Sequence, residues 1–259
     1  MADEPLCERP FRVLRHPELG STNTEALGLA ARGETGPVWV VTDRQTQGRG
    51  RSGRTWTSVD GNLYASLLVT LACPARVLHQ LSLLAGVAVH GAIEAAAARA
   101  GVAVPTLRLK WPNDVLLGEA KVAGILPEST AGQGGATAVV IGVGLNLAGV
   151  PDGLGRAAAC LRETGVHLTP ADMLDHLHPA FLDTLALWDA GHGFPVIRER
   201  WLARAGRLGE AITVNAGGRP VGGTFGGVDP DGALLLREPD GTMRRYTFGD
   251  VSLSARGAG

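Results

Sequence analysis

The sequence predicts an α+β fold in which a mixed β-sheet is flanked by helices and followed by a small C-terminal β-barrel. Up to residue 205, short apolar runs alternate with long alanine-rich segments. After Gly206, short apolar runs alternate with Gly, Pro and Asp turns. With 259 residues, 45% of them hydrophobic, the chain can fill one large core and a small second one. We expect domains over residues 1–205 and 206–259.

The elements of the first domain follow from periodicity and from the residues that bound each run. β-branched or apolar runs between turn residues predict strands over residues 11–14, 38–41, 63–71, 106–110, 115–117, 121–126 and 137–143. The turn Gly118-Glu119 joins the strands over residues 115–117 and 121–126 into a hairpin. Helices are predicted over residues 25–31, 77–100, 169–187 and 195–205. Ser21 to Thr24 offer N-cap side chains to the first helix, and Gly101 suits the end of the second.

The second domain is predicted from four short apolar runs separated by turn residues. These are residues 212–214, 221–225, 234–236 and 246–248. Their number and spacing are typical of a barrel of SH3-like size. The tail, residues 254–259, is expected to be disordered.

Composition excludes several classes of protein. The formal net charge of -1 lacks the basic excess of a nucleic-acid binder. The three cysteines lie far apart without a C-x-x-C pair, which argues against disulfides or a thiolate zinc site. The acidic N-terminus has no signal-peptide core, and polar residues interrupt residues 77–100, so no membrane span is expected. We expect a cytoplasmic protein with no membrane or DNA partner.

The glycine–arginine loop, residues 43–57, contains Gly48-Arg49-Gly50-Arg51-Ser52-Gly53 and formally matches G-x-G-x-x-G. A dinucleotide site would need a helix to begin there, whereas Thr55-Trp56-Thr57-Ser58 and a strand follow. Glycines and forked arginine donors instead suit a mobile clamp for an anion. The alternative is a solvated surface turn. Trp56 suits either stacking on a flat ligand or a core position.

A second cluster joins Lys110-Trp111-Pro112-Asn113-Asp114 to Lys121 and Gly124 on the next strand. Only two of the 24 cationic residues are lysines, Lys110 and Lys121, so a lysine here indicates a need for a compact charge. Asn113 can donate to phosphate, and Asp114 can hold Mg²⁺. An Asx-turn and an edge-strand charge are the respective alternatives.

The third cluster, Gly142-Val143-Gly144-Leu145-Asn146, places two glycines on an apolar strand. Glycine at such positions indicates close approach of a ligand, or tight packing of the strand. Asn146 could contact the edge of an adenine base.

Together, the order and spacing of these clusters and of Ser21-Thr22-Asn23 resemble the biotin–protein ligase family, in a monofunctional form without a DNA-binding domain. The resemblance covers most of the chain up to about residue 150. It implies a class II synthetase-like catalytic domain that uses ATP and Mg²⁺ to activate biotin as biotinyl-5′-AMP. Biotin would then pass to a lysine of a biotin carboxyl carrier protein. Monomers and homodimers are both compatible with the family.

The resemblance also implies roles for individual residues. Lys121 and Arg51 would be catalytic, and Asp114 would lie at Mg²⁺. Biotin would be bound by Ser21, Thr22, Asn23, Gln45, Arg49, Gly50, Arg51, Lys121 and Gly124. ATP and the adenylate would be bound by Arg51, Arg54, Trp56, Asn113, Asn146 and Lys121.

One residue departs from the family pattern, and two other functions compete with this one. Pro127 stands where an apolar strand residue is expected, and it predicts an early end to its strand. Only 20 residues precede Ser21, too few for a winged-helix repressor domain. A lipoate or octanoate ligase would show an R-R-x-S-G-G-G-like stretch, which is absent here. A non-catalytic ligand sensor would not need both the arginine loop and the lysine hairpin.

Overall fold

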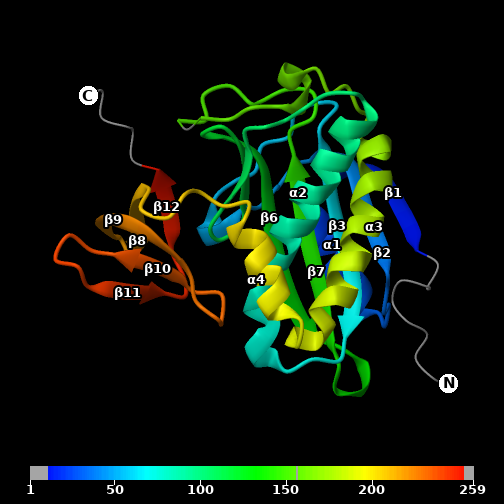
Figure 1. Ribbon diagram of the computed structural model, residues 1–259. Coiled ribbons are helices and arrows are strands. Elements are labelled where there is room, and N and C mark those ends of the chain that lie inside the picture. Colours follow the sequence, from blue (N-terminus) through cyan, green and yellow to red (C-terminus); the bar gives the residue numbers. More distant parts are fainter. Residues whose placement is uncertain (1–10, 156, 254–259) are drawn as a thin grey trace.

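The protein, described here from a computed structural model over residues 11–155 and 157–253, is built on two β-sheets that lie side by side (Figure 1). The larger sheet contains β1 (Arg12–Leu19), β2 (Val38–Gln45), β3 (Leu63–Leu71), β4 (Leu107–Lys110), β5 (Asp114–Leu117), β6 (Ala120–Ala131) and β7 (Thr137–Leu145). Its order is β1-β2-β3-β7-β6-β5-β4. The β1–β2 pair is parallel and the other pairs are antiparallel, so the sheet is mixed as predicted.

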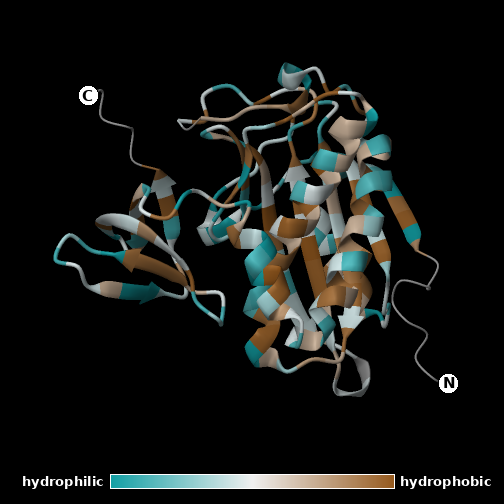
Figure 2. Ribbon diagram, in the orientation of Figure 1, coloured by the Kyte–Doolittle hydropathy of each residue, from teal (hydrophilic) through white to brown (hydrophobic). Residues whose placement is uncertain are grey.

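Helices cover both faces of this sheet. They are α1 (Thr22–Ala31), α2 (Leu81–Arg99), α3 (Pro170–Trp188) and α4 (Phe194–Leu202). Alternate strand residues point to opposite faces, so Val40 and Leu68 pack with α1 while Trp39 and Leu67 join the core formed with α2 and α3. Figure 2 shows hydrophobic residues concentrated in these strands and in the helices over them.

The segment Ala75–Arg99 is long and apolar enough to cross a membrane, but 72% of its most apolar window is buried inside the protein. A 3₁₀ turn over Ala75–Gln80 precedes α2, so the predicted helix is divided in two. The segment forms the centre of the core, as expected of a buried helix.

The smaller sheet is antiparallel and contains β8 (Ala211–Ala216), β9 (Arg219–Val228), β10 (Leu234–Arg237), β11 (Met243–Tyr246) and β12 (Asp250–Leu253), in the order β11-β10-β9-β8-β12. It fits the small SH3-like domain predicted from the sequence. Contacts with the larger unit hold it in place. Arg108 lies 2.9 Å from Glu210, and Arg198 donates to the carbonyl of Val228 at 2.7 Å.

The prediction that Pro127 ends its strand is wrong, because β6 continues to Ala131 with Pro127 opposite Ile141. Ile125, two residues earlier, directs its N–H away from β7, to the carbonyl of Asn113. Pro127 has the same orientation, at a point where β5 no longer pairs with β6. Its missing N–H therefore costs no bond of the ladder.

The strand predicted over residues 246–248 is also displaced. β11 ends at Tyr246, and Phe248 is 63% exposed. A turn at Gly249, with φ of 132°, then leads into β12, which was not predicted. The tail beyond residue 253 and Cys7 lie outside the described residues, while Cys73 and Cys160 are free thiols.

Candidate active site

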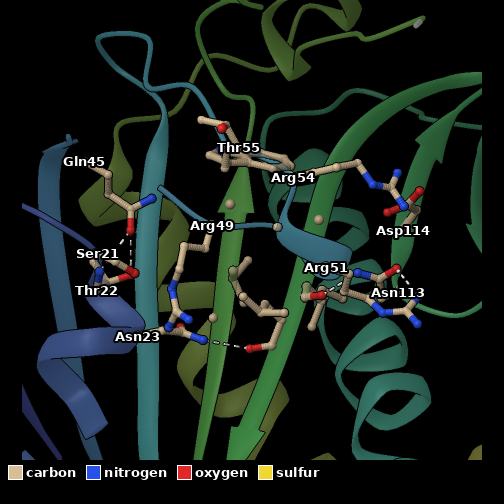
Figure 3. A pocket seen from close by; sticks show the side chains of 18 of the residues that line it. Ser21, Thr22, Asn23, Gln45, Arg49, Arg51, Arg54, Thr55, Asn113 and Asp114 are labelled. Carbon is tan, nitrogen blue, oxygen red and sulfur yellow. Dashed lines mark hydrogen bonds between the residues drawn. The ribbon is translucent and has the colours of Figure 1, made fainter. Parts of the chain in front are cut away.

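A cleft of about 670 Å³, including its open mouth, lies over the glycine-rich ends of β6 and β7 (Figure 3). The start of α1, the end of β2 and the glycine–arginine loop wall it on one side. Asn113, Asp114 and Lys121 wall it on the other, and Asp250 reaches it from the smaller sheet. Four cationic and two anionic side chains line the cleft, which leaves an excess of positive charge for an anionic ligand.

Three glycines form the floor of the cleft. A Cβ on Gly142 would lie 2.2 Å from Oδ1 of Asn23, and one on Gly144 would lie 2.5 Å from the Trp56 ring. Gly124, which pairs with Gly144 across the two strands, also lies against Trp56. Glycine at these positions therefore lets Asn23 and Trp56 lie directly on the sheet, which is the tight packing that the sequence left open as the alternative to close approach of a ligand.

A chain of buried hydroxyl and amide groups forms one end of the cleft. Oε1 of Gln45 accepts from the backbone N–H of Thr22 at 2.9 Å and lies 3.2 Å from the Thr22 hydroxyl. The Ser66 hydroxyl lies 2.7 Å from that of Thr22 and 2.6 Å from Oδ1 of Asn23. These groups fix the side chains in one arrangement, which suits recognition of a polar, uncharged ring.

Arginines of the loop occupy the middle of the cleft. Nη1 of Arg51 donates to Oδ1 of Asn113 at 3.4 Å and to the carbonyl of Gly249 at 3.3 Å. Arg54 pairs with Asp250, whose carboxylate also lies 3.9 Å from Arg51. Burial lowers the pKa of Arg51, and the charge of Asp250 only partly opposes this. The charge of Asp114 opposes it as well, and the guanidinium remains cationic.

Asp114 lies between the two lysines of the chain. Nζ of Lys110 is 2.9 Å from one carboxylate oxygen, and Lys121 pairs with the other. Burial would raise the pKa of Asp114, but the charges and hydrogen bonds of the two lysines outweigh it and lower the pKa. Both oxygens are therefore engaged. Among the described residues, no group of three His, Cys, Asp or Glu side chains could hold a metal ion.

The structure brings nearly all of the predicted site residues into this one cleft: Ser21, Thr22, Asn23, Gln45, Arg49, Gly50, Arg51, Arg54, Trp56, Asn113, Asp114, Lys121 and Gly124. Asn146 is the exception. It lines a smaller neighbouring pocket of about 320 Å³, which it shares with Trp56 and Lys121. Its amide donates to the carbonyl of Ala159 at 3.1 Å, so the structure already uses part of its hydrogen-bonding capacity.

Three residues that contact the side chains of the site were missed in the sequence. Ser66 is fully buried in an apolar strand, and this polar residue among leucines was the available signal. Glu128 accepts from both Asn23 and Arg49, but it follows the proline that was taken to end the strand. Asp250 comes from the smaller sheet, and nothing in its local sequence indicates that it meets the arginine loop.

Comparisons with known proteins show the family to which the chain belongs. The model of the biotin/lipoate A/B protein ligase family matches residues 19–146, and that of the biotin protein ligase C-terminal domain matches residues 208–254. A biotin–[acetyl-CoA-carboxylase] ligase from Paracoccus denitrificans is 44% identical over 227 residues, covering 85% of this chain and 92% of the relative. The bifunctional ligase/repressor BirA of Bacillus subtilis is 35% identical, with 93% of this chain and 74% of the relative covered.

A solved structure gives the same result in three dimensions. The biotin protein ligase from Aquifex aeolicus, in complex with biotin and ATP, superposes with a TM-score of 0.78 and 26% identity, covering 94% of this chain and 99% of that one. The sequence and the fold thus agree, and this chain belongs to the biotin–protein ligase family.

Proposed function

We propose that this chain is a biotin–protein ligase that condenses biotin with ATP in the cleft and transfers the biotinyl group to a lysine of a biotin carboxyl carrier protein. One observation carries this proposal above the others. A pocket of uncharged hydrogen-bonding groups and a cluster of cations lie in the same cleft. Such a cleft suits a molecule with a polar ring at one end and a carboxylate that must meet a phosphate at the other.

The uncharged end is the proposed site of the ureido ring of biotin. Both hydrogen bonds from Thr22 reach Oε1 of Gln45, so the Gln45 amide nitrogen is left to donate into the cleft (Figure 3). The ureido carbonyl needs donors and its N–H groups need acceptors. Ser21, Thr22 and Asn23, all buried at the start of α1, are the remaining groups that we assign to this ring.

The pocket behind Trp56 is the proposed adenine site. Trp56 lines both this pocket and the main cleft, so a nucleotide here would lie beside the cation cluster. The indole Nε1 of Trp56 is buried against Gly144 and has no hydrogen-bond partner among the described residues, so the contact that we propose with adenine is stacking on the ring. Asn146 lines the same pocket.

In the first step, a carboxylate oxygen of biotin attacks the α-phosphorus of ATP and pyrophosphate leaves. The nucleophile is already anionic, so the protein needs no general base. Its task is to hold two anions together, and the charges of Lys121 and Arg51 reduce their repulsion. Asn113 positions Arg51, because its Oδ1 accepts from that arginine while its Nδ2 donates to the carbonyl of Ile125.

In the second step, the amine of the carrier lysine attacks the carbonyl carbon of the mixed anhydride. AMP leaves, and the nitrogen loses a proton as the amide forms. The glycine–arginine loop covers the adenylate between the two steps, which keeps water from hydrolysing it. We place the division between the catalytic and C-terminal domains near residue 205 and propose a cytoplasmic location, where both the carrier and ATP are found.

Magnesium belongs to this proposal only as the ion that accompanies ATP. Asp114 was predicted to hold it, but both oxygens of Asp114 accept from lysines. A bound metal usually needs one or two carboxylates that are available to it, in addition to substrate phosphates. The residues present do not fit a resident ion, and we assign no step to one.

The proposal is tested by measuring pyrophosphate release from Mg-ATP in the presence of biotin, lipoate or octanoate. We expect pyrophosphate release with biotin but not with lipoate or octanoate, followed by biotinylation of an added carrier domain. Release with lipoate or octanoate instead would mean that the protein catalyses the same adenylation reaction on a different acid. Folded protein that releases pyrophosphate with none of the acids would refute the assignment as a ligase.

A further inference from the structure

We propose that Glu128 is a positioning residue that latches the glycine–arginine loop over the biotin end of the cleft and sets the donor and acceptor polarity of that end. The identity of the ligand rests on the proposed function, whereas the latch itself does not. Glu128 lies outside the cleft lining and belongs to none of the motifs recognised in the sequence.

One carboxylate oxygen of Glu128 receives two donors from different parts of the chain. Oε2 accepts from Nη2 of Arg49 at 2.8 Å and from Nδ2 of Asn23 at 2.6 Å. Arg49 belongs to the loop and Asn23 to the first turn of α1. Figure 3 shows the side chain of Arg49 extending toward Asn23. Glu128 thus joins the loop to the helix from the strand beneath both.

The position of Glu128 follows from the alternation of β6. Gly124, Leu126 and Glu128 are two residues apart, so their side chains share a face of the strand. Gly124 and Leu126 line the cleft, and the carbonyl of Leu126 also accepts from Nδ2 of Asn23 at 3.0 Å. Because β6 continues through Pro127, Glu128 extends this row beyond the floor of the cleft.

A carboxylate at this point determines the orientation of Asn23. It can only accept, so the amide nitrogen of Asn23 must face Glu128 and Oδ1 must face the Ser66 hydroxyl. The Ser66 hydroxyl in turn lies against that of Thr22, which meets Gln45. A connected series of hydrogen bonds therefore runs from Gln45, at the start of the loop, to Arg49 within it.

An ordinary surface ion pair contributes little to stability, and the exposed fractions of Arg49 and Glu128, 44% and 27%, would allow that interpretation. The shared bond to Asn23 distinguishes this pair, because the Asn23 residue is only 3% exposed and its amide cannot turn to water. Loss of the charge on Glu128 should therefore loosen the loop and the buried amide together.

The first test uses trypsin, because the loop carries its own cleavage sites at Arg51 and Arg54. Glu128→Gln is compared with the unmodified protein, without biotin or ATP, and cleavage at these two sites is followed by mass spectrometry. We expect cleavage to be about 10-fold faster in the variant. The charge-assisted hydrogen bond to Arg49 is lost, and the bond to Asn23 is no longer held in one orientation. The melting temperature should change little.

Glu25→Gln is the matched control. Glu25 pairs with Arg32 at 3.0 Å with exposed fractions of 34% and 63%, but it lies away from the cleft lining. Its loss should leave cleavage of the loop unchanged. Equal rates for Glu128→Gln and the unmodified protein, or equal acceleration in the control, would overturn the proposal.

A second variant keeps the test decisive if Glu128→Gln folds poorly. Arg49→Gln should accelerate cleavage at Arg51 and Arg54 to a similar degree, and the double variant should be no faster than either single one. Additive effects would mean that the two residues do not act through each other. In the active enzyme, Glu128→Gln should weaken biotin binding about 10-fold without changing ATP affinity measured alone. Failure of the pyrophosphate assay would refute the ligase assignment and leave the trypsin result standing.

Discussion

Replacement of Gly144 by alanine should disable the nucleotide end of the cleft and leave the fold intact. The added Cβ would lie 2.5 Å from Cε2 and 2.7 Å from Cζ2 of Trp56. Carbon atoms that are not bonded prefer about 3.5–4.0 Å, so the indole must retreat by about 1 Å. It cannot simply slide along the sheet, because the neighbouring Gly124 also lies against the ring and Lys121 lies 5.2 Å from its centroid.

The size of the effect follows from where the strain is relieved. Adding a methyl group to a tightly packed site costs about 1–3 kcal/mol. Trp56 is in the loop rather than in the core of the sheet, so its displacement should alter ligand binding more than unfolding. Because about 1.4 kcal/mol corresponds to a tenfold change in affinity, the expected increase in the KM for ATP is about 5-fold to 150-fold.

The assay compares pyrophosphate release over a range of ATP concentrations with calorimetric binding of biotin in the absence of ATP. Gly91→Ala is the control, because nothing lies within 4 Å of a Cβ at that helical position. It should be neutral or stabilising by up to about 1 kcal/mol. A folded Gly144→Ala variant with an unchanged KM for ATP would show that the position of Trp56 does not matter to the nucleotide.

Lys121→Ala should lower the rate of adenylation by about 100-fold or more and preserve the fold, because Asp114 retains Lys110 at 2.9 Å; near-normal pyrophosphate release by a folded variant would contradict this role. Arg51→Ala should let the adenylate escape and biotinylate proteins other than the carrier, and unchanged retention of the intermediate would argue against it. Acidification from about pH 7.5 to about pH 5.5 should destabilise the protein, because burial lowers the pKa of His178, whose Nδ1 accepts from Trp39. As the pH falls, His178 is protonated in the unfolded protein before it is protonated in the folded one. The contribution of the neutral histidine to the free energy of unfolding is therefore complete above about pH 6.5 and is lost as the pH falls below it. His178→Asn should melt with a weaker dependence on pH, and an unaltered dependence would exclude His178 as the cause.

Local sequence patterns predicted the elements of this fold wherever one periodicity dominated. β3 was predicted from Leu63 to Leu71, as found, because a mostly apolar run of this length with β-branched residues has few other interpretations. The four-residue strand β12 was missed, since Val251 and Leu253 are too few apolar residues to show alternation. The order of the strands was beyond local patterns, because it pairs β3 with β7 from distant parts of the chain.

The site was predictable in its residue types and not in its connections. Glycines on an apolar strand and arginines in a glycine-rich loop have few structural uses, so their chemistry could be inferred from the sequence. The partners of these groups depend on tertiary packing. Asp250 meets Arg54 only because the smaller sheet lies against the loop, and Glu128 meets Arg49 only because β6 continues past Pro127.

The structure gives a physical reason for lysine, rather than arginine, at the two positions where this chain uses it. Lys110 and Lys121 both donate to Asp114, whose side chain is only 12% exposed. Two compact ammonium groups can share one small carboxylate in this space, whereas a planar guanidinium would require a wider approach. Lys121 lines the cleft and Lys110 does not. When a phosphate enters, Lys121 can therefore turn toward it while Lys110 continues to compensate Asp114, so that the buried carboxylate is never left without a counter-charge.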